Sequence, residues 1–387
     1  MEWKEVRLGD VCEIYGRIGF RGYTTNDLVD TPKEGAISLS PKNIINGELN
    51  LDKCTYIKWD KYYESPEIMI NPNEIIITKT GSSVGRTTFV RRVVHPMTLN
   101  PQLVVLKNIS ENAEFLSYYI KSSLFQSVLK SIVVGSAIPT LSQKNLANLI
   151  INVPKEVDDQ RRIASILSSL DRKIELNNKI NADLEEMAQA IFKNWFVDFE
   201  PFKDGKFVDS ELGMNPEGWK VGTLEDLITI KYGKDHKKLG DGTFPVYGSG
   251  GFMRFVNSWL YDGESVLIPR KGTLDNIMYV CEKFWTVDTM FFSVPKMDYV
   301  MKYVYNYIKR FDFSKMNEGT SVPSNTAARL NKMPILIPTH EILEMYDETL
   351  CPVYNKRKMK DKESRTLSLL RDTLLPRLMS GELEVPE

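Results

Sequence analysis

The sequence predicts a mixed α/β (α+β) fold in which two homologous globular domains are separated by two long antiparallel helices that form a coiled coil. Three observations predict it: two segments recur in the same order, strand-like runs lie between them, and a long helical pattern follows each half. The chain has 387 residues, of which 42% are hydrophobic and 26% charged. This length allows roughly two to three domains of about 150 residues, and the recurrence favours two.

The two recurring segments align without gaps. Residues 3–14 read WKEVRLGDVCEI and residues 219–230 read WKVGTLEDLITI, with Trp, Lys, Leu, Asp and Ile positions in common. The later segments are GSAIPTLSQKNLANLIINVP and GTSVPSNTAARLNKMPILIP, which share the pairs Gly135/Gly319, Pro139/Pro323, Leu146/Leu330, Ile151/Ile335 and Pro154/Pro338. Solenoid repeats are much shorter, so the recurrence indicates a duplicated domain.

Four parts of the chain follow from these repeats. We expect a globular domain over residues 1–157, a central helix over 158–200, a second globular domain over 201–339, and a C-terminal helix with a tail over 340–387. Within the first domain, short runs such as EIIIT and LVVL lie between Gly, Pro and Asn and predict strands. Apolar residues at three- and four-residue steps predict one helix over residues 113–130.

The central helix is predicted by a stretch without Gly or Pro from Asp158 to Phe196. Asp158 and Asp159 suit a helix N-terminus, where carboxylates meet free backbone amides. Such a helix would span about 58 Å at about 1.5 Å per residue, which is longer than a domain core requires. It must therefore pair with another helix, through the heptad positions Leu167, Leu170, Ile174, Asn177, Asn181, Leu184, Ala188, Ile191 and Trp195.

The expected partner is the C-terminal segment, residues 341–378. Pro352 should kink or interrupt its early turns, and Gly381 should end it. Its middle is polar, like the Asn-bearing middle of the central helix, and this polar centre either fixes the register or forms a contact face for another subunit. The apolar residues at equivalent heptad places are Leu350, Val353, Leu367, Leu374 and Leu378, and the polar middle consists of Arg357, Lys360 and Ser364.

A basic glycine turn between two strand-like runs occurs in each half. Residues 77–90 read ITKTGSSVGRTTFV and residues 267–280 read LIPRKGTLDNIMYV. Gly81, Gly85 and Gly272 permit tight backbone geometry. A single such turn is ordinarily a plain hairpin, whereas its recurrence makes DNA binding an equally good interpretation. The side chains suited to phosphate oxygens or base edges are Lys79, Thr80, Ser82, Ser83, Arg86, Arg270, Lys271, Thr273 and Asn276.

Further basic or polar loops are weaker candidates, because a basic surface loop is usually only solvated. They occur in GRIGFRG, SPKNIING, KYGKDHKKLG and YGSGGFMRF. Their candidate DNA-binding residues are Arg17, Arg21, Lys42, Asn43, Lys234, His236, Lys237, Ser249 and Arg254.

The sequence lacks the motifs of an enzyme. There is no GxxxxGK[ST] phosphate loop and no Asn/Asp-Pro-Pro-aromatic run of the kind that holds a base for methylation. The 4 cysteines and 3 histidines are scattered, so we expect no metal site and no catalytic residue. The N-terminus is charged and no run of about 18 apolar residues occurs, which predicts a cytoplasmic protein. The formal net charge of −1 does not itself indicate a nucleic-acid partner.

Together these segments resemble the DNA specificity subunit of type I restriction-modification systems. The resemblance covers the whole chain and rests on the Trp-led segments, ITKTGSSVGRTTFV, GSAIPTLSQKNL, INVPKEVDDQRRIASILSSLDRKIELNN and the C-terminal LRDTLLPRLMSGEL. Each motif is moderately specific, whereas their order is strong evidence.

The resemblance implies a non-catalytic subunit whose two target recognition domains each read one part of a bipartite, asymmetric site in double-stranded DNA. The loops of Gly81 and Gly272 would face DNA. The two long helices would set the spacer length and dock two methyltransferase subunits, which use S-adenosylmethionine. ATP-dependent restriction/translocase subunits would bring ATP and Mg²⁺, and this chain itself would bind no cofactor.

Two departures and two alternatives remain. The second recognition domain is shorter than the first, and the second helix is polar and contains Pro352, so the spacer length is not predicted. A structural coiled-coil scaffold would explain the helices but not the two basic turns. A standalone DNA-modifying enzyme would need the absent motifs.

Overall fold

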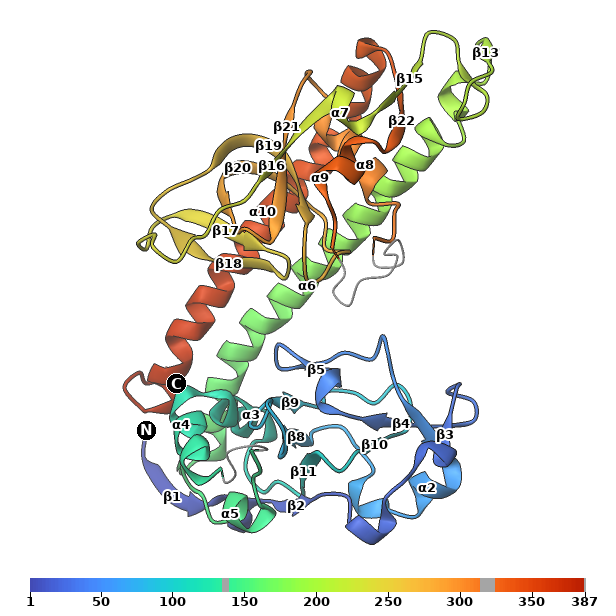
Figure 1. The fold of residues 1–387 in the computed structure, drawn as a ribbon. Coiled ribbons are helices and arrows are strands. Elements are labelled where there is room, and N and C mark those ends of the chain that lie inside the picture. The colour runs from blue at the N-terminus through green and yellow to red at the C-terminus, as the bar shows by residue number, and fades with distance from the viewer. Residues whose placement is uncertain (134–138, 314–323, 386–387) are drawn as a thin grey trace. The chain divides into compact units, whose positions relative to one another are not determined.

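The computed structural model describes residues 1–133, 139–313 and 324–385. The chain forms two compact units, one of Met1–Leu176 with Glu363–Glu387 and the other of Asn177–Lys362. Each unit therefore contains one globular domain together with part of both long helices (Figure 1). Residues 135–138 and 319–323 of the recurring segments, which include the matched Gly135, Gly319 and Pro323, lie outside the described residues.

The first unit contains two four-stranded sheets. Strand β1 (Trp3–Arg7) pairs antiparallel with β12 (Ile150–Pro154), which joins the two recurring segments of this half. One sheet has the order β2 (Glu13–Tyr15), β11 (Leu103–Lys107), β8 (Ile75–Thr78), β9 (Thr87–Phe89). The other has the order β10 (Met97–Leu99), β4 (Gly35–Leu39), β7 (Tyr56–Lys58), β3 (Leu28–Val29), with a separate pair β5 (Ile44–Ile45) and β6 (Glu48–Leu49).

Short helices connect these strands. The α-helices are α1 (Leu8–Val11), α2 (Trp59–Tyr63), α3 (Ala113–Lys121), α4 (Ser123–Ile132) and α5 (Gln143–Ala147), and the 3-10 helices are η1 (Gly19–Arg21), η2 (Thr25–Asp27), η3 (Pro41–Asn43) and η4 (Pro66–Ile68).

The prediction of one helix over residues 113–130 was wrong. The helix ends at Lys121 and a new one begins at Ser123, because Ser122 has an extended conformation (φ −65°, ψ 152°). The Ser122 hydroxyl donates to the Tyr119 carbonyl at 2.6 Å and accepts from the Phe125 amide at 3.4 Å. Serine at this place caps a new helix, and apolar periodicity alone does not reveal such a cap.

The second unit contains one six-stranded sheet with the order β16 (Ile228–Tyr232), β21 (Met290–Pro295), β19 (Tyr261–Pro269), β20 (Met278–Thr286), β17 (Phe244–Gly248), β18 (Gly251–Val256). Its recurring segments again pair, as β15 (Lys220–Thr223) with β22 (Pro334–Ile337). The remaining elements are η5 (Glu200–Phe202), the pair β13 (Phe207–Val208) and β14 (Asn215–Pro216), and the helices α7 (Leu224–Leu227), α8 (Met301–Ile308) and α9 (Ala327–Asn331).

The strand orders confirm the duplication. The order β2-β11-β8-β9 in the first unit corresponds to β16-β21-β19-β20 in the second, and in both units the last two strands form an antiparallel hairpin. The first unit adds a separate sheet, whereas the second extends its sheet with β17 and β18. The two units therefore share a four-stranded arrangement and differ in the strands added to it.

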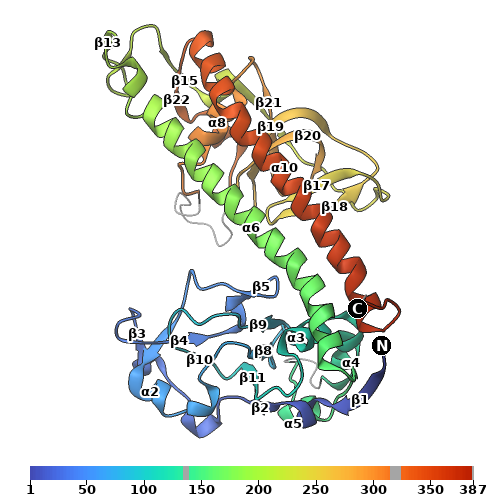
Figure 2. The same cartoon turned by 180° about the vertical axis from the view of Figure 1, so that it is seen from behind.

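The two long helices are α6 (Val157–Phe196) and α10 (His340–Met379), which run side by side in both views (Figure 1 and Figure 2). Within the first unit Asp171 pairs with Arg371. Within the second unit Asn181 bonds Asp361 and Glu185 pairs with Arg357, so the helices are antiparallel as predicted.

Of the kink or interruption expected at Pro352, the interruption does not occur, since α10 continues through this residue. Pro352 removes one backbone donor, but Leu350 and Tyr354 on either side are 0% and 5% exposed. Packing of these side chains outweighs the local preference. The helix ends near Gly381, as predicted: this glycine has φ +75° and its amide donates to the Leu378 carbonyl at 3.4 Å. No helix of the described residues is long and apolar enough to span a membrane.

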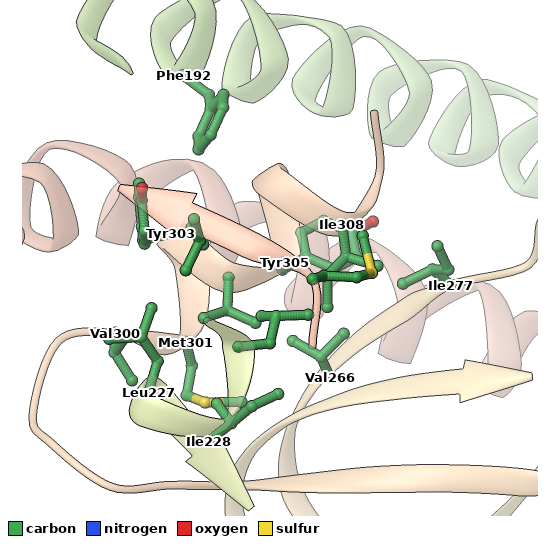
Figure 3. Close-up of a cluster of buried hydrophobic side chains, with 14 of the residues drawn as sticks. Phe192, Leu227, Ile228, Val266, Ile277, Val300, Met301, Tyr303, Tyr305 and Ile308 are labelled. Carbon is green, nitrogen blue, oxygen red and sulfur yellow. The ribbon is translucent and has the colours of Figure 1, made fainter. Parts of the chain in front are cut away.

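Each unit has its own apolar core, to which both long helices contribute. In the second unit Phe192 of α6 lies 5.6 Å from Tyr303 of α8, measured between ring centroids, and Val266 and Ile228 come from the sheet (Figure 3). In the first unit Leu167 of α6 and Leu378 of α10 join the core around Ile75. The ends of the long helices are therefore built into the globular domains.

Candidate nucleic-acid interface

The first basic turn, residues 79–86, connects β8 to β9 as a hairpin. Its base is closed by the Thr78 amide, which donates to the Arg86 carbonyl at 2.8 Å, and by the Gly85 amide, which donates to the Thr78 carbonyl at 2.9 Å. Gly81 and Gly85 have φ of +102° and +88°, values that favour glycine. The hairpin interpretation and the binding interpretation are therefore compatible, because this hairpin presents polar side chains at its tip.

The recurring segment after Pro139 fixes this turn from one side. The Leu141 amide donates to the Lys79 carbonyl at 2.8 Å, and the Gly81 amide donates to the Pro139 carbonyl at 3.0 Å. On the other side of the turn, the Lys79 amide donates to the backbone carbonyl of Gln102 at 2.8 Å. The turn is thus held in one conformation by backbone hydrogen bonds, which leaves its side chains available.

The second turn, residues 270–277, is held in the same way. The Asn325 amide donates to the Arg270 carbonyl at 3.0 Å, and Lys271 forms a β-bridge with Ser324, as Thr80 does with Thr140 in the first unit. Gly272 has φ +88° and corresponds to Gly81. In each unit, therefore, the basic turn is bonded to the recurring segment beside it, and the two recur together.

The predicted side chains of the turns are all at least partly accessible to solvent. Ser82, Arg86, Lys271 and Thr273 are exposed, and the others are partly buried. Burial lowers the pKa of Lys79. In the second turn the Arg270 guanidinium lies 5.4 Å from the centre of the Tyr232 ring, and Asn276 donates to the Ser249 carbonyl at 2.9 Å, so these two are partly engaged within the fold.

Two of the weaker candidates serve the fold. Arg17 is 5% exposed, and its guanidinium donates to the Leu99 carbonyl at 2.8 Å and to Thr98 Oγ1 at 3.1 Å. Asn43 is 4% exposed and donates to the Asn50 carbonyl at 3.1 Å. Both side chains face inward in this structure, and residue type alone did not distinguish them from surface residues.

The other weaker candidates lie at or near the surface. Lys42, Lys234 and Lys237 are exposed, and His236 and Ser249 are partly buried. Arg21 lies 3.4 Å from Glu67. Arg254 is partly buried and donates to the backbone carbonyls of His236 and Leu239 at 2.8 and 2.9 Å, so it holds the loop before β17.

The residues expected to pair the helices are buried or partly buried. Leu167, Asn177, Leu350 and Leu378 are buried, and the partly buried ones are Leu170, Ile174, Asn181, Leu184, Ile191, Trp195, Val353, Leu367 and Leu374. Asn177 is 0% exposed, and neither amide atom has a hydrogen-bond partner among the described residues.

The polar middle of α10 contacts the second domain. Arg357 pairs with Glu185 at 2.5 Å, and the Tyr305 hydroxyl donates to the same carboxylate at 2.9 Å. Burial and the nearby Glu185 charge raise the pKa of Tyr305. Of the two interpretations left open for the polar centre, burial of these groups favours a role in helix register.

The described part of the chain shows no group of three or more His, Cys, Asp or Glu that could hold a metal ion. All four cysteines are unpaired, and burial raises the pKa of the Cys12 thiol to about 12, which keeps it protonated at neutral pH.

The chain thus combines two duplicated domains, each with a fixed basic turn, with two paired long helices. The family described as the type I restriction modification DNA specificity domain matches residues 1–186 and 216–360. The chain belongs to this family.

Relatives match along nearly the whole chain. The MjaIX type I restriction enzyme specificity subunit of Methanocaldococcus jannaschii is 25% identical over 426 residues, covering 100% of this chain and 94% of its own. The HindI specificity subunit of Haemophilus influenzae is 22% identical over 473 residues, covering 99% and 100%. The crystal structure of the S subunit of a type I system from M. genitalium is similar in fold, with a TM-score of 0.58, 18% identity, and coverage of 97% and 96%.

Proposed function

We propose that this chain is the DNA-reading, non-catalytic subunit of a type I restriction-modification complex. Each globular domain reads one part of a bipartite, asymmetric site in double-stranded DNA. The turn of residues 79–86 belongs to one reading surface and the turn of residues 270–277 to the other.

The observation that carries this proposal is the recurrence of a fixed basic turn in both units. Backbone groups of Lys79 and Arg270 bond corresponding residues, Leu141 and Asn325, at 2.8 and 3.0 Å. A turn fixed before binding loses little conformational entropy when it meets a ligand. Different side chains on equivalent turns are what two different half-sites require.

The chemistry of the turns suits DNA. Arg86 and Lys271 are exposed cations that can neutralise phosphates, which gives affinity and a dependence on salt. Thr273, Ser82 and Ser83 can bond base edges or phosphate oxygens. The net charge of −1 is small, so we expect weak binding by the isolated chain and tight binding in the assembled complex.

The helices α6 and α10 set the spacer between the half-sites and dock two methyltransferase subunits. The methyltransferases supply S-adenosylmethionine chemistry, and ATP-dependent restriction/translocase subunits that use ATP and Mg²⁺ complete the complex. The proposed compartment is the cytoplasm, where the complex meets DNA.

The test is methylome sequencing of cells that carry this chain with its methyltransferase. The proposal predicts methylation at one bipartite motif with a fixed gap. Equal numbers of whole helical turns are inserted into α6 after Leu176 and into α10 after Lys362. The gap between the two half-sites in the DNA should become longer, and both half-site sequences should stay unchanged. Absence of any sequence-selective methylation or DNA retention by the complex would instead favour a structural scaffold.

A further inference from the structure

The outer edge of the second unit's sheet carries exposed apolar side chains. Strand β18 is last in the sheet order, and Phe252, Met253 and Phe255 on it are 41%, 51% and 37% exposed. Edge strands usually carry charges or proline, which prevent pairing with other chains. A cluster of large apolar side chains on an edge therefore marks a binding surface.

A β-bulge gives this cluster its arrangement. Tyr247 pairs with Phe252 and Val246 pairs with Arg254, so Met253 is the extra residue of β18. A bulge redirects side chains that would otherwise alternate between the two faces of a sheet, and here Phe252 and Met253 are both exposed. Gly248 makes room for Met253, since a Cβ at this position would lie 2.8 Å from Met253 Sδ.

The tip of the β17–β18 hairpin is fixed to the second basic turn. Asn276 Nδ2 donates to the Ser249 carbonyl at 2.9 Å. A Cβ on Gly272 would lie 2.8 Å from Ser249 Oγ, so the approach depends on glycine. The β17–β18 hairpin, which carries Phe252 and Met253, is therefore fixed to the turn that carries Lys271 and Thr273.

The surroundings of the hairpin are basic. In the loop before β17 the side chains of Lys234, Lys237 and Lys238 are exposed. Arg254 of β18 lies 3.3 Å from His236 and 3.5 Å from Asp241, and Asp235 is the other acidic residue of this loop. A second copy of this chain would bring these cations together, whereas a polyanion would be attracted. Charge complementarity therefore selects DNA as the occupant.

We propose that Phe252 and Met253 read an A·T pair of the second half-site through apolar contact with the thymine methyl group. In the major groove this methyl distinguishes thymine from cytosine, and apolar side chains are its usual partners. The basic residues beside the hairpin bond the phosphates. This inference rests on the proposed function and assigns a reading role to side chains that carry no charge.

The test uses the full chain assembled with its methyltransferase and duplexes in which deoxyuridine replaces each thymine of the second half-site in turn. Deoxyuridine pairs like thymine but lacks the methyl group. At one position the wild-type complex should bind about tenfold more weakly. The double variant Phe252→Ser/Met253→Ser should bind the thymine duplex as weakly as the wild type binds the deoxyuridine duplex, with no further loss on substitution.

The matched control is Met214→Ser, which removes another exposed methionine of the second unit, 56% exposed. It should behave as the wild type. The double variant should keep the wild-type slope of log affinity against log salt, since no phosphate contact is lost. A wild-type complex insensitive to every deoxyuridine, a second half-site without A·T pairs, or equal sensitivity in the double variant would overturn this inference while bipartite methylation still held. Absence of bipartite methylation would instead contradict the proposed function.

Discussion

Arg371 Nη1 donates a hydrogen bond to Asp171 Oδ1 at 2.7 Å, across 200 positions of the sequence. The Tyr118 hydroxyl donates to the other oxygen of the same carboxylate at 2.6 Å. Asp171 therefore joins α3, α6 and α10 within the first unit. The contact explains how the last helix of the chain becomes part of the domain formed by its first half.

Replacing Asp171 by Ala should lower the free energy of unfolding of the first unit by about 2–3 kcal/mol, because Tyr118 loses its acceptor and Arg371 keeps only Asp372 of its two carboxylate partners in a partly buried site. Urea unfolding measures this change. The control is Glu2→Ala, whose side chain is 78% exposed beside Lys155, and it should change stability by less than about 0.5 kcal/mol. Equal effects of the two variants would contradict the role given to Asp171.

Lys302 gives a pH-dependent prediction for the second unit. The residue is 3% exposed, with Nζ 2.7 Å from Asp347 and 3.2 Å from Glu264. Burial alone would lower the pKa of Lys302, but the bond to Asp347 and the two carboxylate charges outweigh burial and raise it. The stabilisation is therefore present below the ordinary lysine pKa and is lost as pH rises through the raised value.

Lys302→Met should cost about 2–4 kcal/mol at pH 8, because it leaves two carboxylates without their cation. The difference in unfolding free energy between wild type and variant should shrink above about pH 10.5. Lys283→Met removes an exposed lysine 3.7 Å from Asp262 and serves as the control. A difference that does not change between pH 8 and pH 11 would refute the assignment.

Gly272 should tolerate alanine less well than Gly81. Both have positive φ, which costs about 1–2 kcal/mol for alanine. Only at Gly272 does the new Cβ also meet a close atom, Ser249 Oγ at 2.8 Å, whereas at Gly81 the nearest neighbour is 3.7 Å away. Gly272→Ala should therefore lose more stability and weaken reading of the second half-site, and adding Ser249→Gly should restore part of both. Urea midpoints and methylation of each half-site measure this.

Asn177→Leu should raise the free energy of unfolding by about 1–3 kcal/mol, because Asn177 is fully buried and its amide lacks partners among the described residues. The same change should make the helix register less specific, seen as more than one gap length in the methylated motif. Asn178→Leu alters the exposed neighbour and should change stability by less than about 0.5 kcal/mol. A destabilised Asn177→Leu protein with a single gap would argue against a register role.

The sequence predicted the parts of the fold that depend on local pattern. The central helix is predicted over residues 158–200, with no glycine or proline from Asp158 to Phe196, and α6 occupies Val157–Phe196. The two basic turns were expected from glycine between β-branched runs and are hairpins. A long helical segment and a basic glycine turn each occur once per half of the sequence, and a pattern seen twice is less easily produced by chance.

The missed features depend on a local side-chain cap or on tertiary contacts. Ser122 ends a helix through a cap, and Pro352 is carried within α10 by the packing of its neighbours. Arg17 is buried because Leu99 and Thr98 supply acceptors from a distant strand. The bulge that exposes Met253 depends on strand pairing. The apolar residues in GGFMRF are the sequence signal for that surface.

The most direct test of the account is an exchange of residues 1–155 for the corresponding domain of a relative with a different target, followed by methylome sequencing. Because each unit has its own core and its own fixed turn, the exchanged protein should methylate a motif in which one half-site is new, while the other half-site and the gap are unchanged. A motif altered in both halves would contradict the claim that the two domains read DNA independently.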